Sequence, residues 1–457
     1  MGAMKEDETR EGLVENETTS EEMEYGSIAD IASSQPEIPK RDGEKNDNVN
    51  PKSSRICCKT SVTVAIVFIV GLTLVTIQMT SGTILAVSSQ LLPATHDKST
   101  HHLVAVKMAF VQVAFEVGLI TGVILCGKVT YTFGYVYPFW SGLITALVAI
   151  TMSIFAFVWW ILPIAHLLIG LSVAFIRNAG STMVAVAFDD KSKRVKALAV
   201  LYSCRYGGIG LGFATGLYEV HWLGRSIPFM ILFITLGIAI IVRSCIEVEN
   251  NRDLDAKVEK PFQLKVVKSM LTDPQTMTLI GLNSIYSVTS NIYLSLVPLW
   301  VMEYLKIEHW QLATVRLTST VTFILSSNIF GLVISKTIHH RWIYFVAYCL
   351  LATTSFISYP FITYIWQAFG PDCLAIVGFS LQGCFYNSWL SDVADKKFDQ
   401  NYETIFALSV VISHVITIAA LSTAGTLQHI VGYPAIFITV GILNCIYSFT
   451  SLIVRGH

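Results

Sequence analysis

Long apolar stretches recur about a dozen times along the chain, each close to the length that a helix needs to cross a bilayer. A spanning helix requires roughly 20 apolar residues, because each residue adds only about 1.5 Å. The pattern predicts twelve spans, at residues 62–87, 103–126, 137–156, 158–180, 197–219, 227–244, 276–302, 312–335, 342–364, 370–390, 403–425 and 431–454. The chain is therefore predicted to be an all-α membrane protein.

Composition and charge divide this pattern into regions. Hydrophobic residues make up 53% of the chain and charged residues 14%, against about a quarter charged in soluble domains. Residues 1–55 hold 14 acidic and 7 basic side chains with few aromatics, so a disordered acidic cytosolic tail is predicted over 1–59. A charged stretch after the sixth span predicts a cytosolic linker at 246–275, between six-helix halves at 60–245 and 276–457.

Basic side chains in the short loops predict the orientation, because such residues are enriched on the cytosolic side. If the N-terminal tail is cytosolic, nine basic residues fall on that side: Lys128, Lys191, Lys193, Arg194, Lys196, Lys336, Arg341, Lys396 and Lys397. Three fall on the other: Lys98, Arg225 and Lys306. We therefore expect a multi-pass protein with both termini in the cytosol.

A few polar side chains stand inside the apolar spans. Such groups are costly in hydrocarbon, so those present usually face the protein interior or a wet cavity. We predict that seven line a substrate or proton cavity: Gln78, Glu116, His166, Asn291, Arg316, Gln382 and His414. For Glu116 the alternative is a neutral acid bonded to Gln112, one turn away. For Arg316 it is a structural pair with an acid, and for the two histidines it is ordinary packing.

Glycines and acids near the span ends suggest moving parts. Gly127 and Gly134, around the basic turn after the second span, are predicted to form a cytosolic gate with Asp392 and Asp395. Three glycines at intervals of four give the fifth span a smooth face that another helix can approach closely: Gly208, Gly212 and Gly216. This face is either ordinary small-residue packing or the hinge of a rocking carrier.

Several motifs resemble the vesicular monoamine and acetylcholine transporters, a branch of the major facilitator superfamily. They are Leu271-Thr272-Asp273-Pro274, Val297-Pro298-Leu299-Trp300, Asn328-Ile329-Phe330-Gly331, Gly134-Tyr135, Gly224-Arg225 and Gly432-Tyr433-Pro434. The similarity covers roughly residues 60–454. It implies the major facilitator fold, with the substrate site between two six-helix halves, and proton-coupled antiport of cationic transmitters into acidic vesicles.

The acids that this resemblance implies are missing from the spans. Their positions fall at Leu74, Leu294, Gln382 or Gly383, and Val410. The basic residue of the family's second span falls near Phe115, beside Glu116, and His414 stands one turn after Val410. Amides cannot titrate, but histidines can near neutral pH, so proton coupling would have to follow another route.

The sequence thus favours a transporter of a small organic solute, amine-like by resemblance, with proton antiport into vesicles as one possibility. A facilitator of another solute, or a regulatory protein that keeps the fold without transporting, is the alternative. No nucleophile–base pair or metal-ligand spacing indicates an enzyme. We expect no cofactor and no nucleic-acid partner, and a synaptic-type vesicle or other endomembrane ahead of the plasma membrane.

Overall fold

The computed structural model describes residues 52–91, 98–187, 191–245, 264–334, 341–398 and 402–454. Most of the predicted tail and residues 246–263 of the predicted linker lie outside this part of the chain. The first half consists of α1 (Lys52–Leu91), α2 (Lys98–Phe133), α3 (Val136–Ile154), α4 (Ile161–Ala187), α5 (Lys191–Leu223) and α6 (Ile227–Ser244). Helix α1 begins at Lys52, within the last residues of the stretch predicted as tail.

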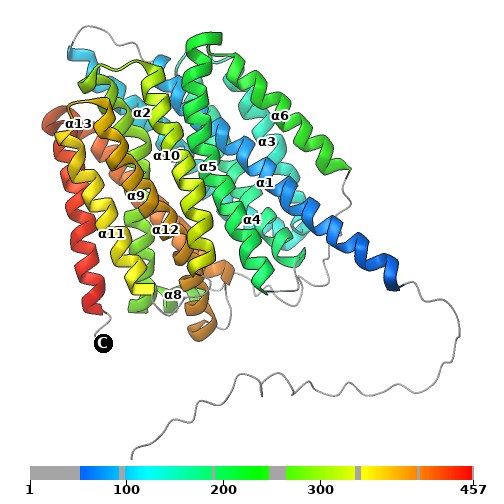
Figure 1. Cartoon of the computed structure of the whole chain (residues 1–457). Coiled ribbons are helices and arrows are strands. Elements are labelled where there is room, and N and C mark those ends of the chain that lie inside the picture. Colours follow the sequence, from blue (N-terminus) through cyan, green and yellow to red (C-terminus); the bar gives the residue numbers. More distant parts are fainter. Residues whose placement is uncertain are drawn as a thin grey trace, which may run out of the picture. The chain divides into compact units, whose positions relative to one another are not determined.

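The second half follows the short helix α8 (Leu264–Thr272). It consists of α9 (Pro274–Leu305), α10 (His309–Ile334), α11 (Arg341–Ser358), the 3₁₀ turn η3 (Tyr359–Phe361), α12 (Ile365–Lys397) and α13 (Tyr402–Val454). Helix α13 is two spans joined at a kink, where Gly432 has a φ of 76° and a ψ of 165°. Only glycine adopts this backbone region without strain, and the break gives the twelve predicted transmembrane helices (Figure 1).

Two of the twelve helices are less apolar than the rest. Nine described helices are long and apolar enough to cross a membrane on length and composition alone, with the kinked α13 counted once. Helices α5 and α10 are absent from those nine, and they pack against each other across the two halves (Figure 1). Part of the polar surface of these two helices is thus used in the contact between the halves, as in the bond of Ser203 on α5 to Ser327 on α10.

The helices form two bundles, which contact each other through a few pairs of helices. In the first half α4 packs on α2 and α3, and α3 on α6. In the second half α12 packs on α10 and α11, and α13 on α9 and α11. The halves meet where α5 contacts α10 and where α2 contacts α13 and α9. This places any residue of those helices that faces inward at the boundary between the halves.

The glycine face of α5 packs closely against α1. A Cβ atom built on Gly212 would lie 2.0 Å from the carbonyl oxygen of Met79, and one on Gly208 would lie 2.9 Å from that of Val75. On Gly216 it would lie 3.2 Å from the Cβ of Ala86. Backbones can approach this closely only where side chains are absent. The close packing expected of this face is present, and its role as a hinge stays a prediction.

Replacing Gly212 with alanine is expected to lower the thermal unfolding temperature of the purified protein in detergent. The added methyl group must push α1 and α5 apart, and overpacking of this kind costs about 1–3 kcal/mol. Gly237→Ala is the matched control, because a Cβ there meets no atom within 4 Å. That control should be neutral or slightly stabilising. Equal losses in both variants would contradict the close α1–α5 contact.

The start of α9 is capped as the sequence predicts. Asp273 Oδ2 accepts hydrogen bonds from the backbone nitrogen of Thr276 at 2.8 Å and from its hydroxyl at 2.6 Å. Asp273 Oδ1 accepts from Lys397 Nζ, at the end of α12, at 2.7 Å. Burial acts to raise the pKa of Asp273, but these bonds from Lys397 and Thr276 outweigh it and hold the pKa below 3.8.

Asp273→Ala is expected to destabilise the protein at neutral pH by about 0.5–2 kcal/mol, the usual worth of an N-cap. Because the folded pKa is lowered, the ionised carboxylate contributes fully above its ordinary pKa and progressively less as the pH falls below it. The variant should therefore unfold at a lower temperature than the parent at pH 7. Below pH 4 the two unfolding temperatures should converge. Asp273→Asn keeps a capping side chain and should lose less at pH 7. A difference that does not depend on pH would contradict the role of the charge.

Candidate substrate cavity and proton site

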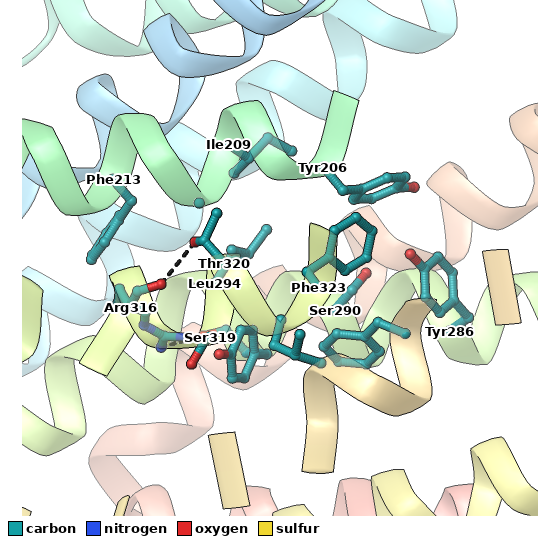
Figure 2. A pocket seen from close by; sticks show the side chains of 14 residues that line it. Tyr206, Ile209, Phe213, Tyr286, Ser290, Leu294, Arg316, Ser319, Thr320 and Phe323 are labelled. Atoms are coloured by element: carbon teal, nitrogen blue, oxygen red, sulfur yellow. Dashed lines mark hydrogen bonds between the residues drawn. The ribbon is translucent and has the colours of Figure 1, made fainter. Parts of the chain in front are cut away.

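A cavity lies between the halves, enclosed by α5 on one side and by α9, α10 and α12 on the other (Figure 2). Aromatic rings make up most of its wall: Tyr206, Phe213, Tyr286, Tyr293, Phe323 and Phe379. The remaining lining residues are Ile209, Gly210, Ser290, Leu294, Arg316, Ser319, Thr320 and Ile376. Arg316 is the only charged side chain among them. The wall thus combines apolar surface with one cation, as organic-solute sites commonly do.

The cavity is small in this conformation. About 60 Å³ is open to the centre of a water-sized molecule, which is room for a few waters. Sites for drug-sized ligands measure about 300–1,000 Å³. An organic solute can enter only if the helices around the cavity separate, so the structure shows the closed form of this space.

A second polar centre joins α2 to α9 and α13. Glu116 on α2 is 1% exposed, and its Oε2 contacts His414 Nδ1 on α13. Gln112, one turn before Glu116, places its Nε2 3.4 Å from Glu116 Oε1 and 2.5 Å from Asn291 Oδ1 on α9. The structure therefore brings together three of the predicted cavity residues: Glu116, Asn291 and His414. Carboxyl and imidazole groups are the side chains that most often transfer protons in proteins, so this contact is a candidate proton site.

Arg316 reaches an acid that the sequence prediction missed. Its Nη1 lies 3.5 Å from Asp372 Oδ2, and its Nη2 donates to the carbonyl oxygen of Tyr293 at 3.2 Å. Asp372 is 2% exposed and accepts hydroxyl bonds from Tyr293 at 2.9 Å, Ser319 at 2.8 Å and Tyr359 at 2.5 Å. The structural pair considered as the alternative for Arg316 is therefore present, in addition to its place in the cavity wall.

The match to a family model decides the class of protein. Residues 68–421, more than three quarters of the chain, match the model of the Major Facilitator Superfamily. The chain belongs to this superfamily of transporters. Its fold, its twelve helices and its multi-pass membrane character follow from that membership.

Among curated proteins, this superfamily member is distantly similar to vesicular amine transporters. It is 23% identical over 328 residues to the chromaffin granule amine transporter of Homo sapiens, covering 70% of this chain and 60% of that one. For the synaptic vesicular amine transporter of Mus musculus the identity is 22%, with 70% and 61% covered. The chain thus spans about three fifths of the length of these relatives. It is a divergent relative of that family.

Solved structures show the same architecture. A POT family transporter crystallised with 5-aminolevulinic acid superposes with a TM-score of 0.66, over 85% of this chain and 95% of that one. Sequence identity is 11%, so this likeness concerns the fold alone.

The polar centre of this superfamily member reverses the charges that the resemblance implies. The resemblance places a basic residue near Phe115 on the second span and an acid at Val410 on the eleventh, and this sequence has neither. The structure has the acid, Glu116, on the second span and the titratable base, His414, on the eleventh, one turn beyond the expected position at Val410. An acid and a base thus meet between these two helices, but each stands on the helix where the resemblance implies the other.

His166 does not line the cavity, and its ring nitrogens bond to residues other than Glu116, although Glu116 is close enough to interact with it electrostatically. Its Nε2 is 2.8 Å from Ser81 Oγ on α1, and its Nδ1 is 3.0 Å from the carbonyl oxygen of Val111 on α2. Both ring nitrogens are therefore occupied within the first half, and the side chain is fully buried. The packed histidine considered as the alternative is the arrangement found here.

The two predicted cavity glutamines are buried but do not line the cavity. Gln78 is fully buried where α1 meets Gly208 of α5, and neither atom of its amide bonds to another described residue. Gln382 on α12 is 1% exposed, and its Nε2 likewise has no partner among the described residues. Their cavity role stays a prediction that this closed conformation does not display.

The predicted gate is only partly described. Gly134 has a φ of 79° in the turn between α2 and α3, a conformation that favours glycine. A Cβ on Gly127 would meet no atom within 4 Å among the described residues, and its place in a gate stays a prediction. Asp392 and Asp395 lie in α12, but their side chains are outside the described part of the chain. The described ion pair at this end is Lys397 with Asp273.

Asp372→Ala is expected to destabilise the protein by about 3–5 kcal/mol, because it leaves Arg316 buried without a counter-charge. The double variant Arg316→Gln/Asp372→Asn removes both charges and should recover most of that loss. Thermal unfolding in detergent measures both. A double variant as unstable as Asp372→Ala would show that the pairing of charges is not what stabilises this cluster.

Proposed function

We propose that the protein carries a small organic solute, amine-like in its chemistry, in exchange for protons taken up and released at Glu116 and His414. The observation that supports this most directly is the contact of these two side chains across the halves, between α2 and α13. A carrier that rocks its halves about a central site must break or rearrange such a contact in each cycle. Protons bound at the contact would then be coupled to that movement.

The charge states of the pair supply the coupling. An ionised Glu116 and a protonated His414 attract each other, by about 4 kcal/mol at 4 Å in a medium of effective dielectric constant 20. Adding a proton to Glu116 removes the attraction, and so does removing the proton from His414. Each factor of ten in the balance between two conformations needs only about 1.4 kcal/mol. A change in the charge of either side chain would therefore favour one conformation of the carrier over the other.

The cavity supports an organic solute of modest size. Rings from α5, α9, α10 and α12 enclose it, and aromatic faces attract both apolar bodies and ammonium groups. The relatives that are named as amine transporters make an amine the first class to test.

For orientation, we propose that both termini face the cytosol and that the protein resides in an endomembrane. The excess of Lys and Arg in the loops assigned to that side supports this. An epitope tag placed before residue 1 should become accessible to antibody only after the plasma membrane of intact cells is permeabilised. Labelling of intact cells that display the protein on their surface would contradict this orientation.

Purified protein in vesicles with an acidic interior is expected to accumulate labelled amines, and Glu116→Gln should abolish accumulation. The amide keeps the shape of the side chain but cannot titrate. Glu308→Gln is the matched control, because Glu308 is an exposed acid outside the Glu116 centre, whose Oε2 accepts from the nearby Trp310 ring at 2.5 Å. Uptake by this control should match the parent.

The alternatives give different results in the same assay. Uptake that persists after the pH gradient is collapsed would identify a facilitator, and gradient-driven uptake by Glu116→Gln would place the proton site elsewhere. Failure of the folded protein to move any solute of a broad panel would favour a regulatory protein that keeps the carrier fold.

A further inference from the structure

The cavity wall contains a guanidinium group with unused hydrogen-bonding capacity. Arg316 is 4% exposed, and its guanidinium carbon lies 4.1 Å from the ring centre of Tyr293 and 5.9 Å from that of Phe213. Both rings line the cavity. The buried Nη1 atom has no hydrogen-bond partner among the described residues. Leaving a buried donor without a partner is unfavourable, so an acceptor inside the cavity would be favoured.

Asp372 does not use up this guanidinium. A full Arg–carboxylate pair is bidentate, with nitrogen–oxygen distances of about 2.7–2.9 Å. Here a single distance of 3.5 Å joins Nη1 to Asp372 Oδ2, and no hydrogen bond forms. The carboxylate is instead satisfied by the hydroxyls of Tyr293, Tyr359 and Ser319. The Nη1 group of Arg316 therefore keeps N–H donors for a second anion.

The lining residues of the cavity include no carboxylate. A simple monoamine would therefore find no anionic partner in the wall, whereas a carboxylate would find the unpartnered Nη1 of Arg316.

We infer that the solute bears a carboxylate group, which binds the N–H groups of Arg316, and that the aromatic wall receives the rest of the molecule. Accordingly, the solute is a zwitterion, an amine that also carries a carboxylate. This rests on the proposed function, because it names the solute class of the same cavity. It also separates the protein from relatives that are named for amines.

Three probes that share one aromatic body test this directly: tyramine with an amine, tyrosine with both groups, and 3-(4-hydroxyphenyl)propionate with a carboxylate. Calorimetric binding to the purified full chain in detergent needs no pH gradient. The two carboxylate-bearing probes should bind about 10- to 100-fold more tightly than tyramine, the worth of hydrogen bonds to a charged group. Loss of transport with this preference intact would overturn the proposed function but not the carboxylate assignment.

The double variant Arg316→Gln/Asp372→Asn should lose the preference while remaining folded. Removing the negative charge of Asp372 would by itself strengthen the binding of carboxylate probes relative to tyramine. A loss of the preference in the double variant must therefore come from the change at Arg316. Arg243→Gln is the matched control, a buried arginine on α6 stacked against Phe139 and Trp140, away from the cavity. It should keep the preference. Equal or tighter binding of tyramine by the parent, binding of none of the three probes, or an unchanged preference in the double variant would overturn the assignment.

Discussion

Polar groups inside a bilayer must find their partners within the protein, and this constraint organises the boundary between the two halves. Apolar side chains gain little when contacts with lipid are replaced by contacts with one another. Close backbone packing and polar contacts therefore decide how transmembrane helices associate. Glu116 meets His414 across α2 and α13, and Gln112 meets Asn291 across α2 and α9. Where no polar partner is needed, the glycines of α5 bring α1 into direct backbone contact instead. Of these contacts, the one between Glu116 and His414 joins two side chains of titratable type.

The sequence was sufficient for the fold because each span is a local signal. Length and apolarity predict a helix wherever they occur, and the kink at Gly432 with Pro434 beyond it separates the last two spans. The polar contacts are harder to predict from the sequence, because they depend on how each helix is rotated relative to its neighbours. Gln112 and Glu116 share a helix face and could be paired from spacing alone. Their partners Asn291 and His414 come from the other half, and no local pattern predicts which face of α9 or α13 turns inward.

Asp372 illustrates the same difficulty from the other direction. It follows Pro371 near the expected outer end of the tenth span, where an acid usually faces water. Helix α12 begins earlier, at Ile365, and places Asp372 against Arg316 and three hydroxyl groups. The unpaired arginine of the eighth span was the signal that could have led to it, since a buried cation requires a counter-charge. Gln78 and Gln382 show the limit of the method: they are buried as predicted, yet outside the closed cavity.

The central claim is that the Glu116–His414 contact couples protons to the movement of the halves. Exchanging the two side chains tests it most directly, through proton-driven solute uptake by Glu116→His, His414→Glu and the double exchange in vesicles. Each single variant places like groups opposite each other and should lose uptake, whereas the double exchange restores a complementary pair and should recover a substantial part of it. Single variants that transport normally, or a double variant as inactive as either single one, would contradict the claim.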